Sequence, residues 1–218
     1  MEKSIETIWK EGFLNSDALV APKLNDLYNQ KSIHIIDKFK RMFRVNLNAI
    51  VVGSLLFLGV SFFIGIPIMG VGFFLVSSVI VIVNKRLSNG LESIDKNVSS
   101  YQYIKAFNHW MKEQLSVNRK MAGFYYPLFF LSMILGFWFS SFDGKLLGEA
   151  LVNKLILSYP DTYLLFGVPL IGILGVILGV CLLAFFGGRI YNWDVSLIYG
   201  RVFKKLEEII ADMEALRS

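Results

Sequence analysis

Long apolar blocks alternate with polar, charged segments along this chain. A membrane helix needs about 20 mostly apolar residues, and four blocks approach or exceed that length: 45–66, 68–83, 121–142 and 163–187. The second block is short, and both a full span and a re-entrant half-span fit it, although the charge distribution favours a full span. The pattern predicts an all-α integral membrane protein with four transmembrane helices.

Lys and Arg are unevenly distributed among the segments between these blocks. Residues 1–44 hold eight, residues 84–120 hold seven and residues 188–218 hold five, whereas the loop 143–162 holds two. Basic residues accumulate on the cytoplasmic side of membrane proteins. We therefore expect both termini and the middle connector in the cytoplasm of a bacterium, with the chain in its inner membrane. The net charge of +5 then reflects contact with the lipid bilayer, and not with nucleic acid.

The spans divide the chain into five parts. These are an N-terminal helical segment (1–44), a transmembrane hairpin (45–83), a cytoplasmic connector (84–120), the third and fourth spans with a short outer loop (121–187), and a C-terminal amphipathic helix (188–218). The connector reads as helix. It is either one bent helix or a hairpin, and Asn97, Ser99 and Ser100 are candidates to cap a new helix midway because their side chains accept from free backbone N–H groups. We expect the three cytoplasmic segments to form a helical layer.

The last helix carries a narrow apolar stripe in a heptad pattern. Its members are separated alternately by four and three residues: Val195, Tyr199, Val202, Leu206, Ile209, Met213 and Leu216. Such a stripe is typical of a coiled-coil seam with another helix, whereas a helix lying on lipid has a wider apolar face. The partner helix is either in the same chain or in another protein.

A second apolar cluster lies near the N-terminus. Ile5, Trp9, Phe13 and Leu14 share a short helix that "NSDA" is expected to end, and a new helix is expected to start near Pro22. An aromatic–aliphatic helix face is typical of a ligand for a hydrophobic groove, so we assign these four residues to binding a soluble cytoplasmic protein. The alternative is that they cap the helical layer or touch the membrane surface.

The sequence provides little that points to catalysis. The four apolar blocks contain no Asp, Glu, Lys, Arg or His, whereas proton- or ion-coupled transporters usually place ionisable groups there. The two histidines, His34 and His109, and the single cysteine, Cys181, do not have the spacing of a metal site. We therefore expect no enzymatic activity, no metal and no cofactor.

Three glycines recur on the fourth apolar block. Gly172, Gly175 and Gly179 lie in "GILGVILGV", and the last two form a GxxxG pair. Glycines at this spacing let membrane helices approach closely. We expect them to pack within the four-helix bundle, with homodimerisation as the second choice.

The chain resembles a set of uncharacterised four-span membrane proteins of Bacteroidota. The resemblance is carried by "IWKEGFLNSDALVAPKLNDLYNQKSI", by "FKRM" and by "LSMILGFWF", and fifteen Lys against seven Arg suit an AT-rich genome. It implies an anti-sigma-like role, although the histidine–cysteine motif of the zinc-binding anti-sigma class is missing here. The expected function is a membrane anchor or regulator of a soluble partner. The alternative is an oligomeric, channel-like pore.

Overall fold

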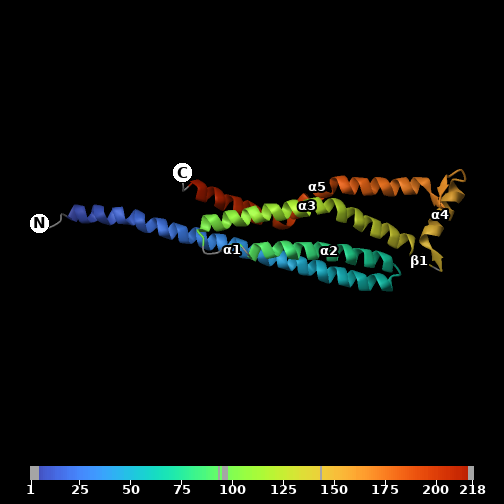
Figure 1. Cartoon of the computed structure of the whole chain (residues 1–218), viewed down its shortest axis with the longest axis horizontal. Coiled ribbons are helices and arrows are strands. Elements are labelled where there is room, and N and C mark those ends of the chain that lie inside the picture. Colours follow the sequence, from blue (N-terminus) through green and yellow to red (C-terminus); the bar gives the residue numbers. More distant parts are fainter. Residues whose placement is uncertain (1–4, 93, 95–97, 143, 216–218) are drawn as a thin grey trace.

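The computed structural model describes the backbone of residues 5–92, 94, 98–142 and 144–215, and side chains from residue 30 onward except 31, 92 and 142 within these ranges. Four long helices and one short helix make up most of it, with two small strand pairs at one end (Figure 1). The elements are α1 (Ile5–Phe63), α2 (Pro67–Glu92), α3 (Ser100–Trp138), β1 (Ser141–Phe142), β2 (Lys145–Leu146), α4 (Leu147–Ser158), β3 (Leu164–Leu165), β4 (Val168–Pro169) and α5 (Leu170–Ala215).

Each long helix runs without interruption from a polar region into an apolar one. We call residues 32–44, 84–120 and 188–215 the charged half, and residues 45–63, 67–83, 121–138 and 170–187 the apolar half. All four long helices are long and apolar enough to cross a membrane, which supports an all-α protein with four spans. Only 6% of the most apolar window of α1, and of α5, is buried within the chain. Lipid or another apolar surface must therefore cover most of the apolar half.

The hydrophobic core lies in the charged half. It joins α1, α2, α3 and α5, and its most deeply buried side chains are Ile36, Ile104, Phe107 and Leu206. Aromatic rings pack around Phe39, whose centroid lies 5.4 Å from that of Phe107 and 5.2 Å from that of Tyr199. A close-packed apolar interior of this kind fixes how the four helices are arranged beyond the apolar half.

Helices α2 and α3 form a hairpin in the charged half. The chain leaves α2 at Glu92 and enters α3 at Ser100. The side chain of Ser99 caps α3 by accepting a hydrogen bond from the backbone N–H of Gln102 at 3.4 Å. The hairpin alternative for residues 84–120 is therefore the observed one.

In the apolar half, neighbouring helices approach closely at small residues. A Cβ placed on Gly136 in α3 would lie 2.2 Å from the Cβ of Met69 in α2, and one placed on Gly187 in α5 would lie 2.7 Å from the carbonyl oxygen of Ala122 in α3. Only glycine fits at these contacts, because missing side chains let membrane helices pack backbone to backbone.

The far end of the apolar half departs from the sequence prediction. Residues 164–169 were assigned to the fourth span, but they form the β3–β4 hairpin, and α5 begins at Leu170. The φ angles of Phe166 and Gly167 are 52° and 76°, which reverses the chain between the two strands. Pro169 precedes the helix and lacks the N–H that a helix interior needs. Within the segment expected as a short outer loop, residues Leu147–Ser158 form the helix α4.

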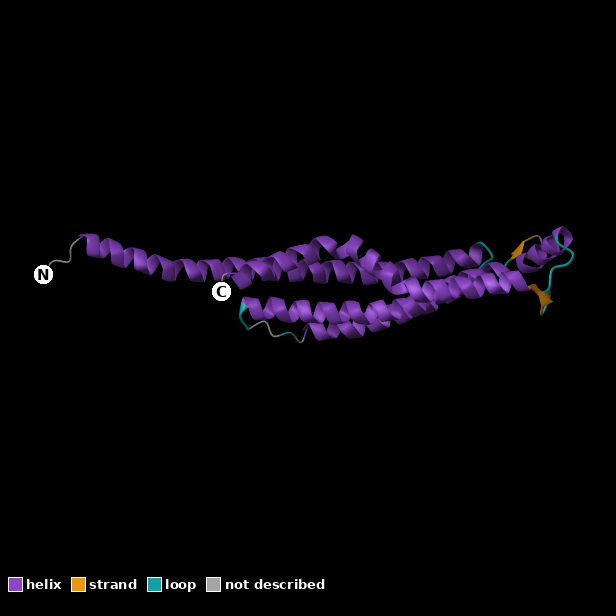
Figure 2. Cartoon of the chain, turned by 90° about the horizontal axis from the view of Figure 1, so that it is seen from above, coloured by secondary structure: helices purple, strands orange, loops and turns teal. Residues whose placement is uncertain are grey.

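Helix α1 is continuous where two helices were expected. The backbone runs in one helix from Ile5 to Phe63, through both "NSDA" and Pro22. Its N-terminal part projects beyond the ends of the other helices in both views (Figures 1 and 2). The predicted break near Pro22 is therefore wrong.

Candidate functional site: a cavity where the charged and apolar halves meet

Two asparagines clamp α2 to α3 where the apolar half ends. The amide nitrogen of Asn84 donates to Asn118 Oδ1 at 2.9 Å, and the amide nitrogen of Asn118 donates to Asn84 Oδ1 at 3.0 Å. Gln114 Nε2 donates to the same Asn84 oxygen at 3.0 Å. All three side chains are buried, with 4–6% exposed. Buried amides need such partners, because an unpaired polar group away from water is costly.

A carboxylate lies across from this clamp on α5. The hydroxyl of Tyr126 in α3 donates a short hydrogen bond to Asp194 Oδ2. The ring of Tyr125 packs against that of Tyr126 at 4.6 Å between centroids. This contact places one acidic side chain and two phenol rings at the level of the amide clamp.

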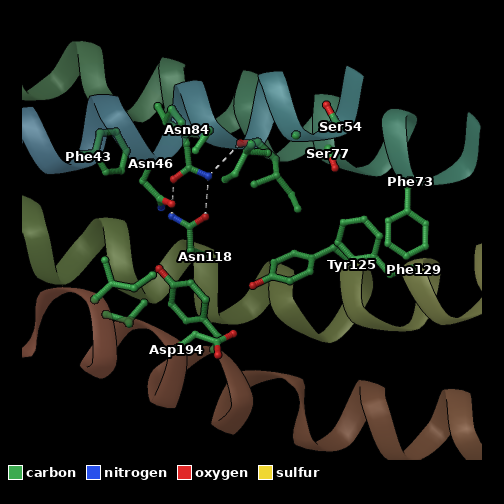
Figure 3. A pocket seen from close by; sticks show the side chains of 18 of the residues that line it. Phe43, Asn46, Ser54, Phe73, Ser77, Asn84, Asn118, Tyr125, Phe129 and Asp194 are labelled. Atoms are coloured by element: carbon green, nitrogen blue, oxygen red, sulfur yellow. Dashed lines mark hydrogen bonds between the residues drawn. The ribbon is translucent and has the colours of Figure 1, made fainter. Parts of the chain in front are cut away.

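Asn84, Asn118, Tyr125 and Asp194 line one cavity of about 620 Å³, to which α1, α2, α3 and α5 all contribute. Figure 3 shows the amides of Asn84 and Asn118 at one end, Phe73 and Phe129 at the other, and Tyr125 between them. The cavity is polar toward the charged half and apolar toward the middle of the apolar half. It has the size of a small-molecule site, roughly 300–1,000 Å³.

The apolar end is built by aromatic rings from three helices. Phe73 in α2 packs on Phe57 in α1 at 5.0 Å and on Phe129 in α3 at 4.8 Å, measured between centroids. The ring of Tyr125 continues this row, 6.2 Å from that of Phe129. Packed rings hold this wall in a fixed shape.

One polar group that lines the cavity remains without a proper partner. Tyr199 in α5 is 6% exposed. Its hydroxyl lies near Asn46 but makes no hydrogen bond of ordinary geometry within the described residues. Burial raises the pKa of this phenol, although the proximity of Asn46 partly offsets the rise. A buried hydroxyl in this state has unused capacity to donate to a ligand.

Two further hollows lie at the same level, and both are basic. One, of about 760 Å³ between α1 and α2, is lined by Lys40, Arg44 and Lys85 together with Asp37. The other, of about 450 Å³ between α3 and α5, is lined by Arg119, Lys120 and Arg189, and its lining contains no acid. Asp194, by contrast, is the only charged residue that lines the 620 Å³ cavity in the part of the chain with described side chains.

The residues of the predicted C-terminal seam are used inside the chain. Five of them are buried in the core of the charged half, and Val195 packs against it: Tyr199, Val202, Leu206, Ile209 and Met213. Leu216 lies outside the described residues. The tail helix therefore pairs with helices of its own chain.

The other predicted sites have different surroundings. Ile5, Trp9, Phe13 and Leu14 lie on the projecting part of α1, and their side chains lie outside the described part. At Gly172 and Gly175 an added Cβ would meet nothing within 4 Å, whereas at Gly179 it would lie 2.9 Å from the ring of Phe130. Close helix packing within the chain therefore occurs at Gly136 and Gly187, and the expectation that Gly172 and Gly175 pack within the bundle is wrong. Homodimerisation through Gly172 and Gly175 stays a prediction.

Sequence reasoning missed the amide clamp and the carboxylate. Asn84 and Asn118 fall just outside the predicted limits of the second and third spans. A signal was present in the sequence, since "VNKR" and "VNRK" place an uncharged amide before a basic pair at both span ends. Nothing in the sequence marks Asp194 as facing Tyr126, because that contact depends on how α3 and α5 cross.

Neither a cluster of metal ligands nor a comparison with known proteins adds a function to this site. In the described part of the chain, no three His, Cys, Asp or Glu side chains gather as metal ligands would. Four serine hydroxyls of the apolar half bond carbonyls of their own helices, as Ser54 does with Val51 at 2.9 Å and Ser132 with Leu128 at 2.7 Å. No known protein family, curated protein or solved structure matches the chain.

Proposed function

We propose that this protein is a non-enzymatic membrane anchor or regulator that binds a soluble cytoplasmic protein through the N-terminal part of α1. The observation that carries the proposal is the projection of this helix beyond the rest of the molecule (Figure 2). From Ile5 to Ser32, which is buried, a helix at 1.5 Å per residue reaches about 40 Å. That length suits a docking arm.

The arm is poorly suited to remain helical alone. Isolated helices are marginal in water, and most helix stability in proteins comes from packing of one face. Pro22 lies inside the arm, where a proline removes a hydrogen bond and costs about 3 kcal/mol. A partner that covers the face of Ile5, Trp9 and Phe13 would supply the missing packing.

The burial of the tail seam narrows the choice of docking surface. Because Tyr199, Leu206 and Met213 already pack inside the chain, the arm becomes the leading candidate and the tail does not. The excess of basic residues in the charged half supports a cytoplasmic location for the arm. The apolar half would then lie in the inner membrane of a bacterium. The family resemblance implies a sigma-type transcription factor as the partner.

The test is mild-detergent purification of the full chain from native membranes, with mass spectrometry and light scattering of the complex. A double substitution, Trp9→Ala with Phe13→Ala, removes the apolar face of the arm. Glu11→Ala is the matched control, because residue 11 lies on the opposite side of a helix from residues 9 and 13. We expect a stoichiometric soluble protein that the double variant loses and the control retains.

Other outcomes would contradict the proposal. A soluble partner retained by the double variant would exclude the arm as the docking site. A homo-oligomer with no soluble partner, combined with ion flux in liposomes, would favour the pore alternative. If the soluble protein that co-purifies with the unmodified chain is not a transcription factor, the anti-sigma interpretation is wrong, whereas the anchor role still stands.

A further inference from the structure

We propose that the 620 Å³ cavity binds an aminophospholipid of the phosphatidylethanolamine type, with its ammonium group at Asp194 and one acyl chain along Phe57, Phe73 and Phe129. The site follows from the contacts that line it. It is independent of the partner proposed for α1.

The cavity has the polarity of an amphiphile site. Its apolar end is a wall of packed rings from α1, α2 and α3, as the contacts of Phe73 with Phe57 and Phe129 show. Its polar end has the amides of Asn84 and Asn118 (Figure 3). The cavity is also lined by Tyr199, whose hydroxyl has no properly formed hydrogen bond within the described residues. A lipid whose head group stays at the boundary between the two halves, with its chain in the apolar half, matches this gradient.

Lipid can enter from the side. The cavity is lined at its α1 edge by Gly53, which lies in the apolar half and is exposed. Helices α1 and α5 meet through the core of the charged half, whereas the most apolar windows of both are almost unburied. The two helices therefore leave the cavity accessible to the surrounding bilayer.

The charge at the site selects the head group. Among the described residues, Asp194 is the only charged one in the lining, and its carboxylate can accept further hydrogen bonds beside the one from Tyr126. A primary ammonium group has three donors and the opposite charge, and aromatic rings also favour a cation. An anionic head group has a better place outside the cavity, where Arg119, Lys120 and Arg189 line a hollow without an acid. Uncharged donors such as the Tyr199 hydroxyl suit the phosphate of a zwitterion.

The experiment uses the full-length protein in vesicles that contain phosphatidylethanolamine and phosphatidylglycerol in equal amounts. Either lipid carries a photoreactive group in its acyl chain, and labelling of each helix is mapped by mass spectrometry. We expect peptides around Phe57 and Phe129 to be labelled about tenfold more by the phosphatidylethanolamine probe, which corresponds to one charge-assisted hydrogen bond.

Two pairs of variants separate the site from the fold. Gly53→Phe fills the cavity from α1, where an added Cβ would meet nothing within 4 Å, and Gly59→Phe is its control, equally open but outside the lining. We expect only Gly53→Phe to lose labelling. Asp194→Asn should reduce the tenfold preference to about twofold or less, whereas Tyr126→Phe, which keeps the carboxylate, should retain it.

Three results would overturn the proposal. These are equal labelling by both probes in the unmodified chain, unchanged labelling of Gly53→Phe, and an unchanged preference in Asp194→Asn. If Gly53→Phe fails to fold, the comparison of Asp194→Asn with Tyr126→Phe still decides. Asp194→Asn removes the charge but keeps an oxygen that can accept from Tyr126, whereas Tyr126→Phe removes this hydrogen bond and keeps the charge. A preference lost equally in both of these variants would show that the head group does not respond to the carboxylate.

Discussion

The amide clamp between α2 and α3 can be tested by a double-mutant cycle of Asn84→Ala and Asn118→Ala. The two side chains exchange hydrogen bonds of 2.9 and 3.0 Å. An interhelical hydrogen bond in a membrane protein contributes about 0.6 kcal/mol on average and at most about 1.7. Two such bonds predict a coupling free energy of about 1–2 kcal/mol.

The two single substitutions leave different groups without partners. After Asn118→Ala, the Asn84 nitrogen still bonds the carbonyl of Ile80 at 2.9 Å, and its oxygen still accepts from Gln114. After Asn84→Ala, the Asn118 nitrogen keeps the Gln114 carbonyl, but Asn118 Oδ1 and Gln114 Nε2 lose their Asn84 partner, so this variant should be the more destabilised of the two. Each single substitution should lower the free energy of unfolding by about 1–3 kcal/mol.

The assay is reversible unfolding of the purified chain in mixed micelles with increasing SDS, followed by circular dichroism. Asn48→Ala is the matched control, because Asn48 is an exposed amide on α1 at a similar level, and we expect a change within about 0.5 kcal/mol. A coupling free energy below about 0.3 kcal/mol would refute the reasoning, since the two amides would then act independently.

Two further tests concern the packing of the chain, and a third concerns the pH dependence of its stability. Gly187→Leu should lower the free energy of unfolding by about 1–3 kcal/mol or more, because even a Cβ would lie 2.7 Å from a carbonyl oxygen of α3. Gly175→Leu is the control, because an added Cβ there would meet nothing within 4 Å. We expect it to be neutral in the same unfolding assay. Leu206→Ala should lower the free energy of unfolding by about 2–5 kcal/mol, because Leu206 is 0% exposed. Glu207→Ala, on the exposed side of the same helix, should change it little. Equal changes in the two variants would contradict a seam buried within the chain. Burial raises the pKa of Tyr103 above its ordinary 10.0, so only the unfolded state loses this proton just above that pH. Stability should be unaffected below about pH 10 and fall above it, and Tyr103→Phe should flatten this fall in thermal midpoints measured against pH.

The location of the amide clamp has a physical logic that extends to the cavity. An amide pair placed where the apolar half ends can be buried without introducing a charge beside lipid. The flanking basic pairs, Lys85 with Arg86 and Arg119 with Lys120, can then reach toward lipid head groups. The clamp also fixes α2 against α3, and so holds the polar end of the cavity in shape.

Several features of the fold followed from local sequence. The four apolar blocks predicted four long apolar helices, and these are present. Ser99 was one of three predicted candidates for a helix cap, with Asn97 and Ser100, and the structure shows that Ser99 caps α3 through a local interaction with a free N–H group. Local reasoning failed at Pro22, which lies within the continuous helix α1, and at residues 164–169, where the chain reverses at Phe166 and Gly167 although the segment is apolar.

The sequence by itself determined which stretches are helical and apolar. It also determined which helix faces are apolar enough to pack against another surface, because hydrophobic periodicity and length are properties of a single segment. Only the tertiary structure decided which faces meet. The heptad stripe of α5 predicted a seam without naming its partner, and the shared core with Phe39 and Phe107 supplies it. Likewise, Asp194 and Asn84 gave no sign of sharing a cavity, because their proximity depends on how four separate helices cross.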